Sequence, residues 1–163
     1  MTDALQTAVE AIRDRILIMQ PLAVTDATYA TSRWVEFRQN PPYWCNKIAG
    51  ISRTSGPNSY PTYNISITMR LILAYHQEIT REDDIDGNSQ VKSWGYIAST
   101  LRYFEKYNLL NPSGYSTNLA VDVAGCTITC PIGLDLKVLP LSKSIYLCVD
   151  FNLDVPVNVG DDE

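Results

Sequence analysis

Two long stretches of alternating apolar and polar residues constrain this chain more than any other feature. In residues 63–75, apolar side chains fall at every second position from Tyr63 to Tyr75, and residues 145–157 repeat this spacing. A period of two is typical of a β-strand with one buried face. The first stretch would reach roughly 40 Å at the usual rise of a strand, which is long for a globular protein. We therefore expect both stretches to lie side by side in one sheet.

Two further segments are predicted to be strands of the same sheet. Residues 43–52 are apolar and rich in β-favouring types, and a turn cluster at 55–59 separates them from 63–75, which predicts an antiparallel hairpin. Residues 126–138 also alternate, but Pro131 and Gly133 interrupt the pattern. Such an interruption predicts a bend or a bulge in the strand.

Two amphipathic helices complete the predicted fold. Residues 3–20 and 89–108 carry apolar side chains at spacings of three and four, and we expect Pro21 to end the first helix. Residues 22–42 read as an irregular arm, and residues 158–163 as a frayed acidic end. The order α-β-β-α-β-β predicts an α+β protein in which one antiparallel four-stranded sheet carries both helices on one face. The length of 163 residues predicts a single domain, 1–163.

Charge and cysteine content narrow the classes of function. The formal net charge is −5 and no basic run is present, which argues against tight binding of nucleic acid. The sequence contains no apolar stretch long enough to span a membrane and no pattern of a secretory leader. The four cysteines are too few for a disulfide scaffold. These features predict assembly in a reducing cytoplasm, without a membrane partner.

A search for catalytic or metal-binding residues yields only weak candidates. The single histidine, His76, would need Cys45 and Asp150 to form a nucleophilic triad, and no local signature supports that pairing. Cys126 and Cys130 are one close pair, whereas structural zinc sites usually have two. The acidic cluster at 82–86 lacks the closing glutamate of a calcium loop. We expect no enzymatic activity, no metal and no cofactor, and an enzyme that uses Cys45 and His76 is the alternative from another class.

Aromatic and acidic residues are the better candidates for contact with other proteins. Tyrosines gather around the first hairpin, and aromatic side chains are enriched at the buried centres of protein interfaces. Core packing is the alternative for each of them. The acidic loop is the second candidate surface. The predicted interface residues are Tyr43, Tyr60, Tyr63, Arg70, Tyr75, Glu82, Asp83, Asp84 and Asp86.

The element order resembles that of the tail terminator, or tail completion, proteins of long-tailed bacteriophages. The features that carry the resemblance are the N-terminal amphipathic helix, the arm, the strand opened by Pro42-Tyr43-Trp44, the long strand 63–75, the acidic loop, one helix and a terminal hairpin that contains residues 146–151. The resemblance spans most of the chain as a topology and includes no diagnostic motif. The long arm and the Pro131–Gly133 interruption depart from the pattern and favour a related neck or head-completion protein as the near alternative.

The resemblance implies a structural virion protein located in the tail or neck. Members of that family form a six-fold ring that stops growth of the tail tube and joins it to the head. The implied partners are further copies of this chain, the tail tube protein and a neck or connector protein, with DNA only passing through the channel. The acidic loop 82–86 and the acidic end 161–163 are the candidates for lining the channel or for docking.

Overall fold

The computed structural model describes residues 4–32, 42–53, 62–76, 87–106, 122–123, 126–138 and 145–158. These residues form an α+β fold with two helices and one mixed sheet of seven strands. The helices are α1 (Ala4–Ala23) and α2 (Gly87–Lys106). The strands are β1 (Ala30–Thr31), β2 (Tyr43–Arg53), β3 (Thr62–His76), β4 (Asp122–Val123), β5 (Thr127–Thr129), β6 (Leu134–Val138) and β7 (Ile145–Asn158).

The two long alternating stretches are neighbours in the sheet, as predicted. Strand β3 pairs antiparallel with β7 from Thr62 opposite Asn158 to His76 opposite Ile145. Strand β2 pairs antiparallel with the other side of β3, which confirms the predicted hairpin. The remaining edge of β7 pairs in succession with β4, β5 and β6, all antiparallel.

The prediction of an antiparallel four-stranded sheet is confirmed only in part, because the sheet has seven strands and the short strands β1 and β4 were not predicted. Strand β1 lies in the segment predicted to be irregular and pairs parallel to β2, with Ala30 opposite Trp44. Two residues carry no periodicity, so the sequence could not reveal this strand. The predicted strand 126–138 is two short strands, because the six positions from Thr129 to Leu134 face only four on β7, from Asn152 to Val149. The extra residues form the expected bulge, and Gly133 adopts a φ of 81° there.

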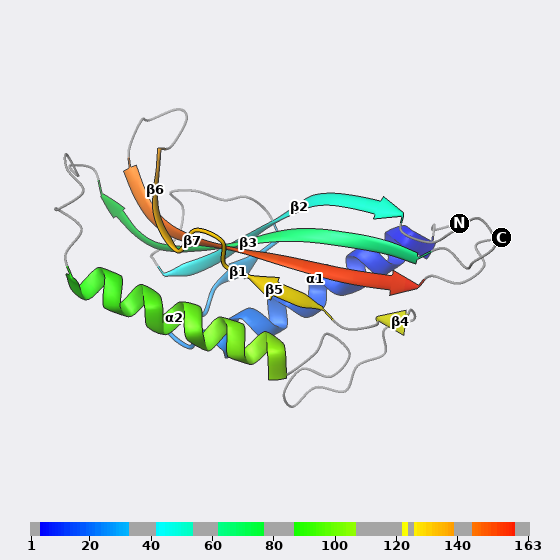
Figure 1. The fold of residues 1–163 in the computed structure, drawn as a ribbon, viewed down its shortest axis with the longest axis horizontal. Helices are drawn as coiled ribbons and strands as arrows, with labels where there is room; N and C mark the ends of the chain where they lie inside the picture. The colour runs from blue at the N-terminus through cyan, green and yellow to red at the C-terminus, as the bar shows by residue number, and fades with distance from the viewer. Residues whose placement is uncertain are drawn as a thin grey trace.

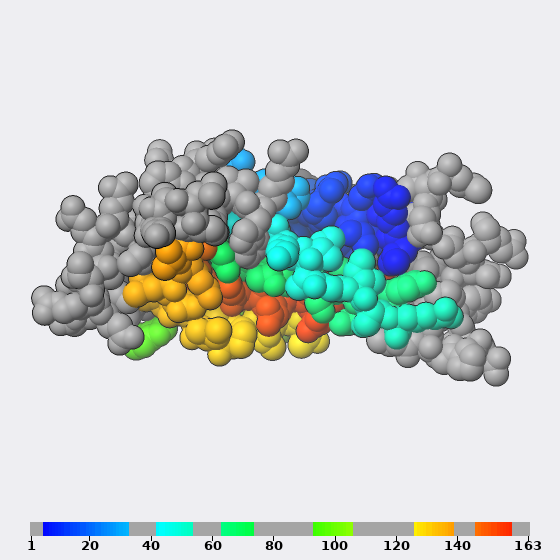
Figure 2. Space-filling view, turned by 90° about the horizontal axis from the view of Figure 1, so that it is seen from above, coloured from blue at the N-terminus to red at the C-terminus, as the bar shows by residue number. Residues whose placement is uncertain are grey.

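Both helices cover the same face of the sheet, as Figure 1 shows. The main core contains Ile12 and Ile16 from α1, Phe104 from α2, Met69 from β3 and Phe151 from β7. We call this the helix face. The opposite face, here the open face, carries a small buried cluster made of Tyr43, Cys45, Ile72, Tyr146 and Cys148. Figure 2 views the molecule from above, and atoms of β2, β3 and β7 reach the surface there.

Helix α1 does not end at Pro21, contrary to the prediction. It continues to Ala23, and the amide of Val24 donates a hydrogen bond of 3.1 Å to the carbonyl of Gln20. A proline lacks an amide donor, so within the last turn it removes only one helical hydrogen bond. The added turn brings Ala23 and Val24 into the core.

Candidate interaction surface

The outer part of strand β2 is the most exposed region of regular structure in the described chain. Every residue from Lys47 to Arg53 is exposed, although this segment pairs with β3 on one side. On the other side, β1 pairs only with Trp44 and Cys45, and β2 has no further strand partner among the described residues. We call residues 47–53 the β2 edge. A strand edge of this kind offers backbone amides and carbonyls to an added strand.

A bulge gives the β2 edge an apolar side. Ile48 pairs with Ile67 and Gly50 pairs with Ser66, so Ala49 is an extra residue in the ladder. The insertion reverses the alternation, and Ile51 then pairs with Ile65 and lies on the helix face like Ile48. Ile48 is 38% exposed and Ile51 is 46% exposed, while their partners Ile67 and Ile65 are buried. The edge thus presents apolar side chains beyond the part of the sheet that α1 covers.

A groove of about 170 Å³ lies beside the β2 edge. Its lining combines apolar and basic side chains from α1, β2 and β3: Arg13, Ile16, Ser32, Asn46, Lys47, Ile48 and Ile67. The groove begins where β1 stops, since Thr31 is the last residue that pairs with β2 and Ser32 is in the wall. Arg13 also contacts Asp14 at 3.3 Å on the exposed side of α1. The groove joins an apolar floor to the cationic group of Arg13, and Lys47 borders it, with its side chain placed on the open face by the register of β2.

Two buried amides hold the inner wall of this groove in place. Gln20 donates to the Oδ1 of Asn46 at 2.6 Å, and Asn46 donates to the Oε1 of Gln20 at 2.9 Å and to the carbonyl of Thr31 at 3.0 Å. Both side chains are almost fully buried. Buried polar groups are tolerated when they are hydrogen-bonded in this way. The pair therefore fixes α1, β1 and β2 to one another directly beside the exposed edge.

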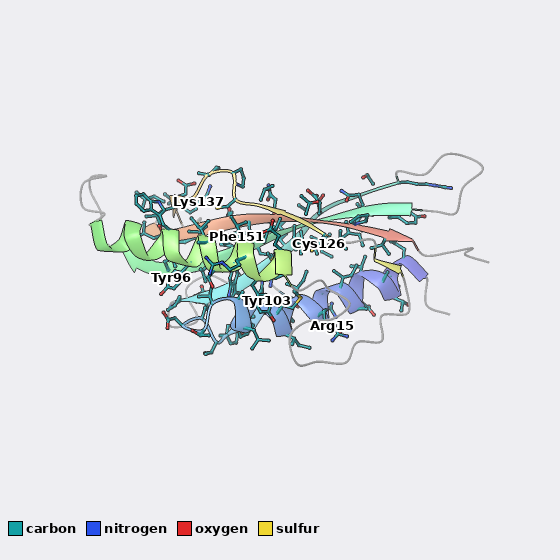
Figure 3. All side chains as sticks on the ribbon, turned by 60° about the horizontal axis from the view of Figure 1, so that its bottom comes forward. Arg15, Tyr96, Tyr103, Cys126, Lys137 and Phe151 are labelled. Carbon is teal, nitrogen blue, oxygen red and sulfur yellow. The ribbon has the colours of Figure 1, made fainter. Side chains whose placement is uncertain are left out.

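The opposite edge of the sheet is also apolar at its surface. Ile132, in the bulge between β5 and β6, is 70% exposed, and Val138 at the end of β6 is 58% exposed. Between them, Lys137 contacts Asp135 at 3.0 Å. Figure 3 shows Lys137 on the side of the sheet away from the helices. Exposed apolar side chains therefore occur at both edges of the sheet.

The open face carries one ion pair with little access to solvent. Arg70 on β3 lies opposite Asp150 on β7 and donates two hydrogen bonds to its carboxylate, at 2.7 and 3.0 Å. Arg70 also donates to the hydroxyl of Tyr146 at 2.7 Å. Burial alone would lower the pKa of the Arg70 guanidinium, but the hydrogen bonds and the negative charge of Asp150 outweigh it and raise that pKa. The arrangement keeps Arg70 charged and joins the two central strands.

A second groove lies between the end of α1 and helix α2. It measures about 430 Å³ and is lined by Leu22, Ala23, Val24, Thr25, Asp26, Gly95, Tyr96 and Ser99. Tyr96 donates a hydrogen bond of 2.9 Å to Asp26 across it. Burial, followed by this bond and the charge of Asp26, raises the pKa of the Tyr96 hydroxyl. Trp94, which precedes Gly95 on α2, does not line this groove and is 64% exposed.

The predicted interface residues that the structure describes lie in different environments. Tyr43 is fully buried and packs edge-on against Tyr29, so it serves the packing of the chain itself. Tyr63 is half-buried opposite Arg53 and Val157, and Arg70 belongs to the ion pair above. For Tyr75 the structure describes only its backbone, which pairs with Tyr146. The remaining candidates, Tyr60, Glu82, Asp83, Asp84 and Asp86, lie outside the described residues.

The strand registers do not bring Cys45 and His76 together. Cys45 is fully buried and pairs with Arg70, whereas His76 lies six positions further along β3. Six positions of strand correspond to roughly 20 Å, too far for an imidazole to reach the thiol. The hypothetical triad of Cys45, His76 and Asp150 is therefore wrong for this fold.

The cysteines also lack the environment of reactive thiols or of a metal site. Burial, together with the charge of Asp150, raises the pKa of the Cys148 thiol to about 12, and burial raises the pKa of Cys126 as well. Figure 3 shows Cys126 close to the ribbons of the helix layer, in agreement with its place beside the main core. Within the described ranges, no three histidine, cysteine or acidic side chains form a cluster that would hold a metal ion. The acidic cluster 82–86, which was predicted to lack the closing glutamate of a calcium loop, lies outside the described residues.

Sequence reasoning missed the two features that define this surface. Ile48 and Ile51 sit three positions apart in a predicted strand, a spacing that regular alternation places on opposite faces. The bulge at Ala49 removes that contradiction, and the odd spacing was the available signal for it. The Gln20–Asn46 contact joins residues 26 positions apart and left no local pattern.

Comparisons with known proteins do not extend this description. The chain matches no model of a protein family and no curated protein. Of the helices in the described part, neither combines the length and apolar composition needed to cross a membrane.

Proposed function

We propose that this protein is a structural subunit of a ring that ends the tail tube of a bacteriophage and joins it to the head or neck. One observation carries the proposal: the sheet has exposed apolar residues at two different edges. Ile48 and Ile51 lie at the β2 edge, and Ile132 and Val138 lie at the β6 side. Two unlike surfaces on one molecule suit head-to-tail association, which closes into a ring when the rotation per subunit fits.

Charge and the arrangement of layers support the same proposal. The net charge of −5 suits a channel that lets DNA pass without holding it, provided that carboxylates face the channel. Both helices lie on one face of the sheet, so within the described ranges no helix covers the open face, and atoms of β2, β3 and β7 reach the surface there. The resemblance of the predicted element order to tail terminator proteins is the reason for proposing this kind of ring.

Native mass spectrometry and electron microscopy of the purified chain test the ring. We expect a closed oligomer, most simply a hexamer, or a monomer that oligomerises on isolated tail tubes. A chain that stays monomeric at high concentration and binds neither tail tubes nor head connectors would contradict the proposal.

A neck or head–tail connector adaptor is the second candidate. The bulge around Ile132 favours it, because this protruding apolar residue departs from the simple terminal hairpin of the resembling family. Cosedimentation separates the two candidates. A terminator binds tail tubes that lack heads, whereas an adaptor binds DNA-filled heads that lack tails.

A further inference from the structure

The β2 edge has the chemistry of a receptor for an extended acidic segment. Its residues from Lys47 to Arg53 are all exposed and have no second strand partner in the described part of the chain. Its helix-face side exposes Ile48 and Ile51, and Arg13 and Lys47 line the adjoining groove. A strand that adds to such an edge gains main-chain hydrogen bonds, and alternate side chains determine its specificity. The matching segment has one apolar side chain flanked by carboxylates.

One segment of this chain has that pattern, namely Glu82-Asp83-Asp84-Ile85-Asp86. In an extended strand, alternate side chains point to opposite faces. When Ile85 enters the apolar groove, Asp83 lies on the same side, towards the basic group of Arg13. Asp84 and Asp86 then lie on the open-face side, where the register of β2 places Lys47. The charges and the apolar position therefore match on both faces of the edge.

The same molecule is unable to provide this segment to its own β2 edge. Lys47 lies opposite Thr68, eight positions before the end of β3 at His76, which corresponds to roughly 26 Å. Ile85 is two residues from Gly87, the first residue of α2, and is thus within about 7 Å of it. Figure 1 shows α2 beginning near the end of the molecule where β3 ends, while β2 ends on the opposite side. A second copy is the remaining source.

We propose that the β2 edge of one copy binds residues 82–86 of a second copy as an added strand, with Ile85 in the groove between α1 and β2. The biological use of this contact rests on the proposed ring, in which it forms the joint between neighbours. The contact itself requires only two copies of the chain.

A peptide of residues 81–88 with a fluorescent label tests the contact through its anisotropy when the full chain is added. We expect saturable binding that weakens as salt rises, because the charges are at the surface. Ile85→Ser in the peptide should weaken binding by about tenfold or more, since it removes the apolar anchor. Absence of saturable binding, or equal binding of the Ile85→Ser peptide, would overturn the proposal.

Charge variants of the full chain place the contact at the β2 edge. Lys47→Glu changes an exposed residue and should weaken peptide binding by about tenfold, and a peptide with Asp84→Lys and Asp86→Lys should restore it. Arg102→Glu makes the same charge change at an exposed position of α2 and serves as the matched control. Equal effects of Lys47→Glu and Arg102→Glu would show nonspecific attraction and would refute the site.

Self-association of the full chain in sedimentation experiments identifies the occupant. Ile85→Ser should reduce association, whereas neutralising the other acidic segment with Asp161→Asn, Asp162→Asn and Glu163→Gln should not. Loss of association in the second variant alone would assign the site to residues 161–163 instead. Loss only with Val138→Asp would assign it to β6. A ring that forms without peptide binding would overturn this inference and leave the proposed function standing. Peptide binding without a ring, and without attachment to tail tubes or heads, would support this inference and contradict the proposed function.

Discussion

At the scale of single residues, two hydrogen-bonded polar pairs connect the elements of the sheet and its helix layer. The Gln20–Asn46 pair lies beneath the β2 edge, and the Arg70–Asp150 pair joins the two central strands. Neither pair was predictable, because the partners are 26 and 80 positions apart and hydrogen-bonding residues have no periodic signature. What the sequence did predict at this scale was the apolar side of each long strand, where alternation alone identifies the buried residues.

Replacing one member of the buried amide pair should lower the free energy of unfolding more than replacing both members. Asn46→Leu leaves the Gln20 amide buried without its partner and should lower the free energy of unfolding by about 2 kcal/mol. Gln20→Leu combined with Asn46→Leu removes both polar groups and should recover about half of this loss. Urea unfolding of the single and double variants measures the difference. Additive losses would show that the amides do not act as a pair.

Stability should fall at alkaline pH through Cys148. Its folded pKa of about 12 lies above the value of 9.0 for a free thiol, so the stabilisation is complete below pH 9 and is lost as pH rises towards 12. At pH 10 the loss of stability amounts to about 1 kcal/mol, because the thiol ionises in the unfolded chain and not in the folded chain. The Cys148→Ala variant should show a shallower decline between pH 9 and pH 11 in denaturant titrations. Parallel declines in the two proteins would refute this assignment.

At the scale of elements, periodicity predicted both helices and the long strands to within a few residues. It failed where the structure departs from a regular period. Strand β1 has only two residues, the bulge at Ala49 changes the alternation within β2, and α1 continues past Pro21 because a proline in the last turn removes a single hydrogen bond. These departures depend on tertiary neighbours, which a local pattern does not contain.

Deleting Ala49 tests the role of the bulge. Ala49 is the extra residue between the pairs Ile48–Ile67 and Gly50–Ser66, so the deletion should leave a regular ladder in which Ile48 and Ile51 stay together on the helix face. We expect a change in unfolding free energy of less than about 1 kcal/mol, because these residues are already exposed, and binding of the 81–88 peptide within about twofold of wild type, because both isoleucines keep their side. Thermal unfolding and anisotropy measure the two effects. A marked loss of binding would mean that the bulge itself, and not only the shared side of the two isoleucines, organises the receptor.

At the scale of the whole molecule, the sequence predicted one sheet with both helices on the same face. Burial demands this arrangement, since each helix has one apolar stripe and the sheet has one continuous apolar face. The sequence did not reveal which apolar residues stay at the surface. Ile48 and Ile132 resemble core residues in type, and their exposure follows from strand order alone. The exposed apolar residues of the candidate interface were therefore beyond prediction, and the role of the acidic segment 82–86 stays a prediction.

The second edge of the sheet should contribute to association and not to folding. Ile132 is 70% exposed, so Ile132→Ser should change the free energy of unfolding by less than about 0.5 kcal/mol. If the edge around β6 is part of the ring interface, the same change should shift the oligomer towards monomer in native mass spectrometry. Leu136→Ser, at a half-buried position of β6, is the comparison, because it should affect stability as well. Equal oligomer populations in wild type and Ile132→Ser would remove this edge from the interface.

The central position of β7 has a consequence for how the protein is made. This strand pairs with β3 on one side and with β4, β5 and β6 on the other, yet Arg70 meets Asp150 only after 80 further positions of chain. In a nascent chain, β3 therefore has an exposed apolar face and unpaired backbone amides and carbonyls along one side until β7 leaves the ribosome. Closing so distant a pairing is slow, and the waiting strands are prone to aggregate. Expression at low temperature or with a chaperone that holds unfolded chains should accordingly raise the soluble yield.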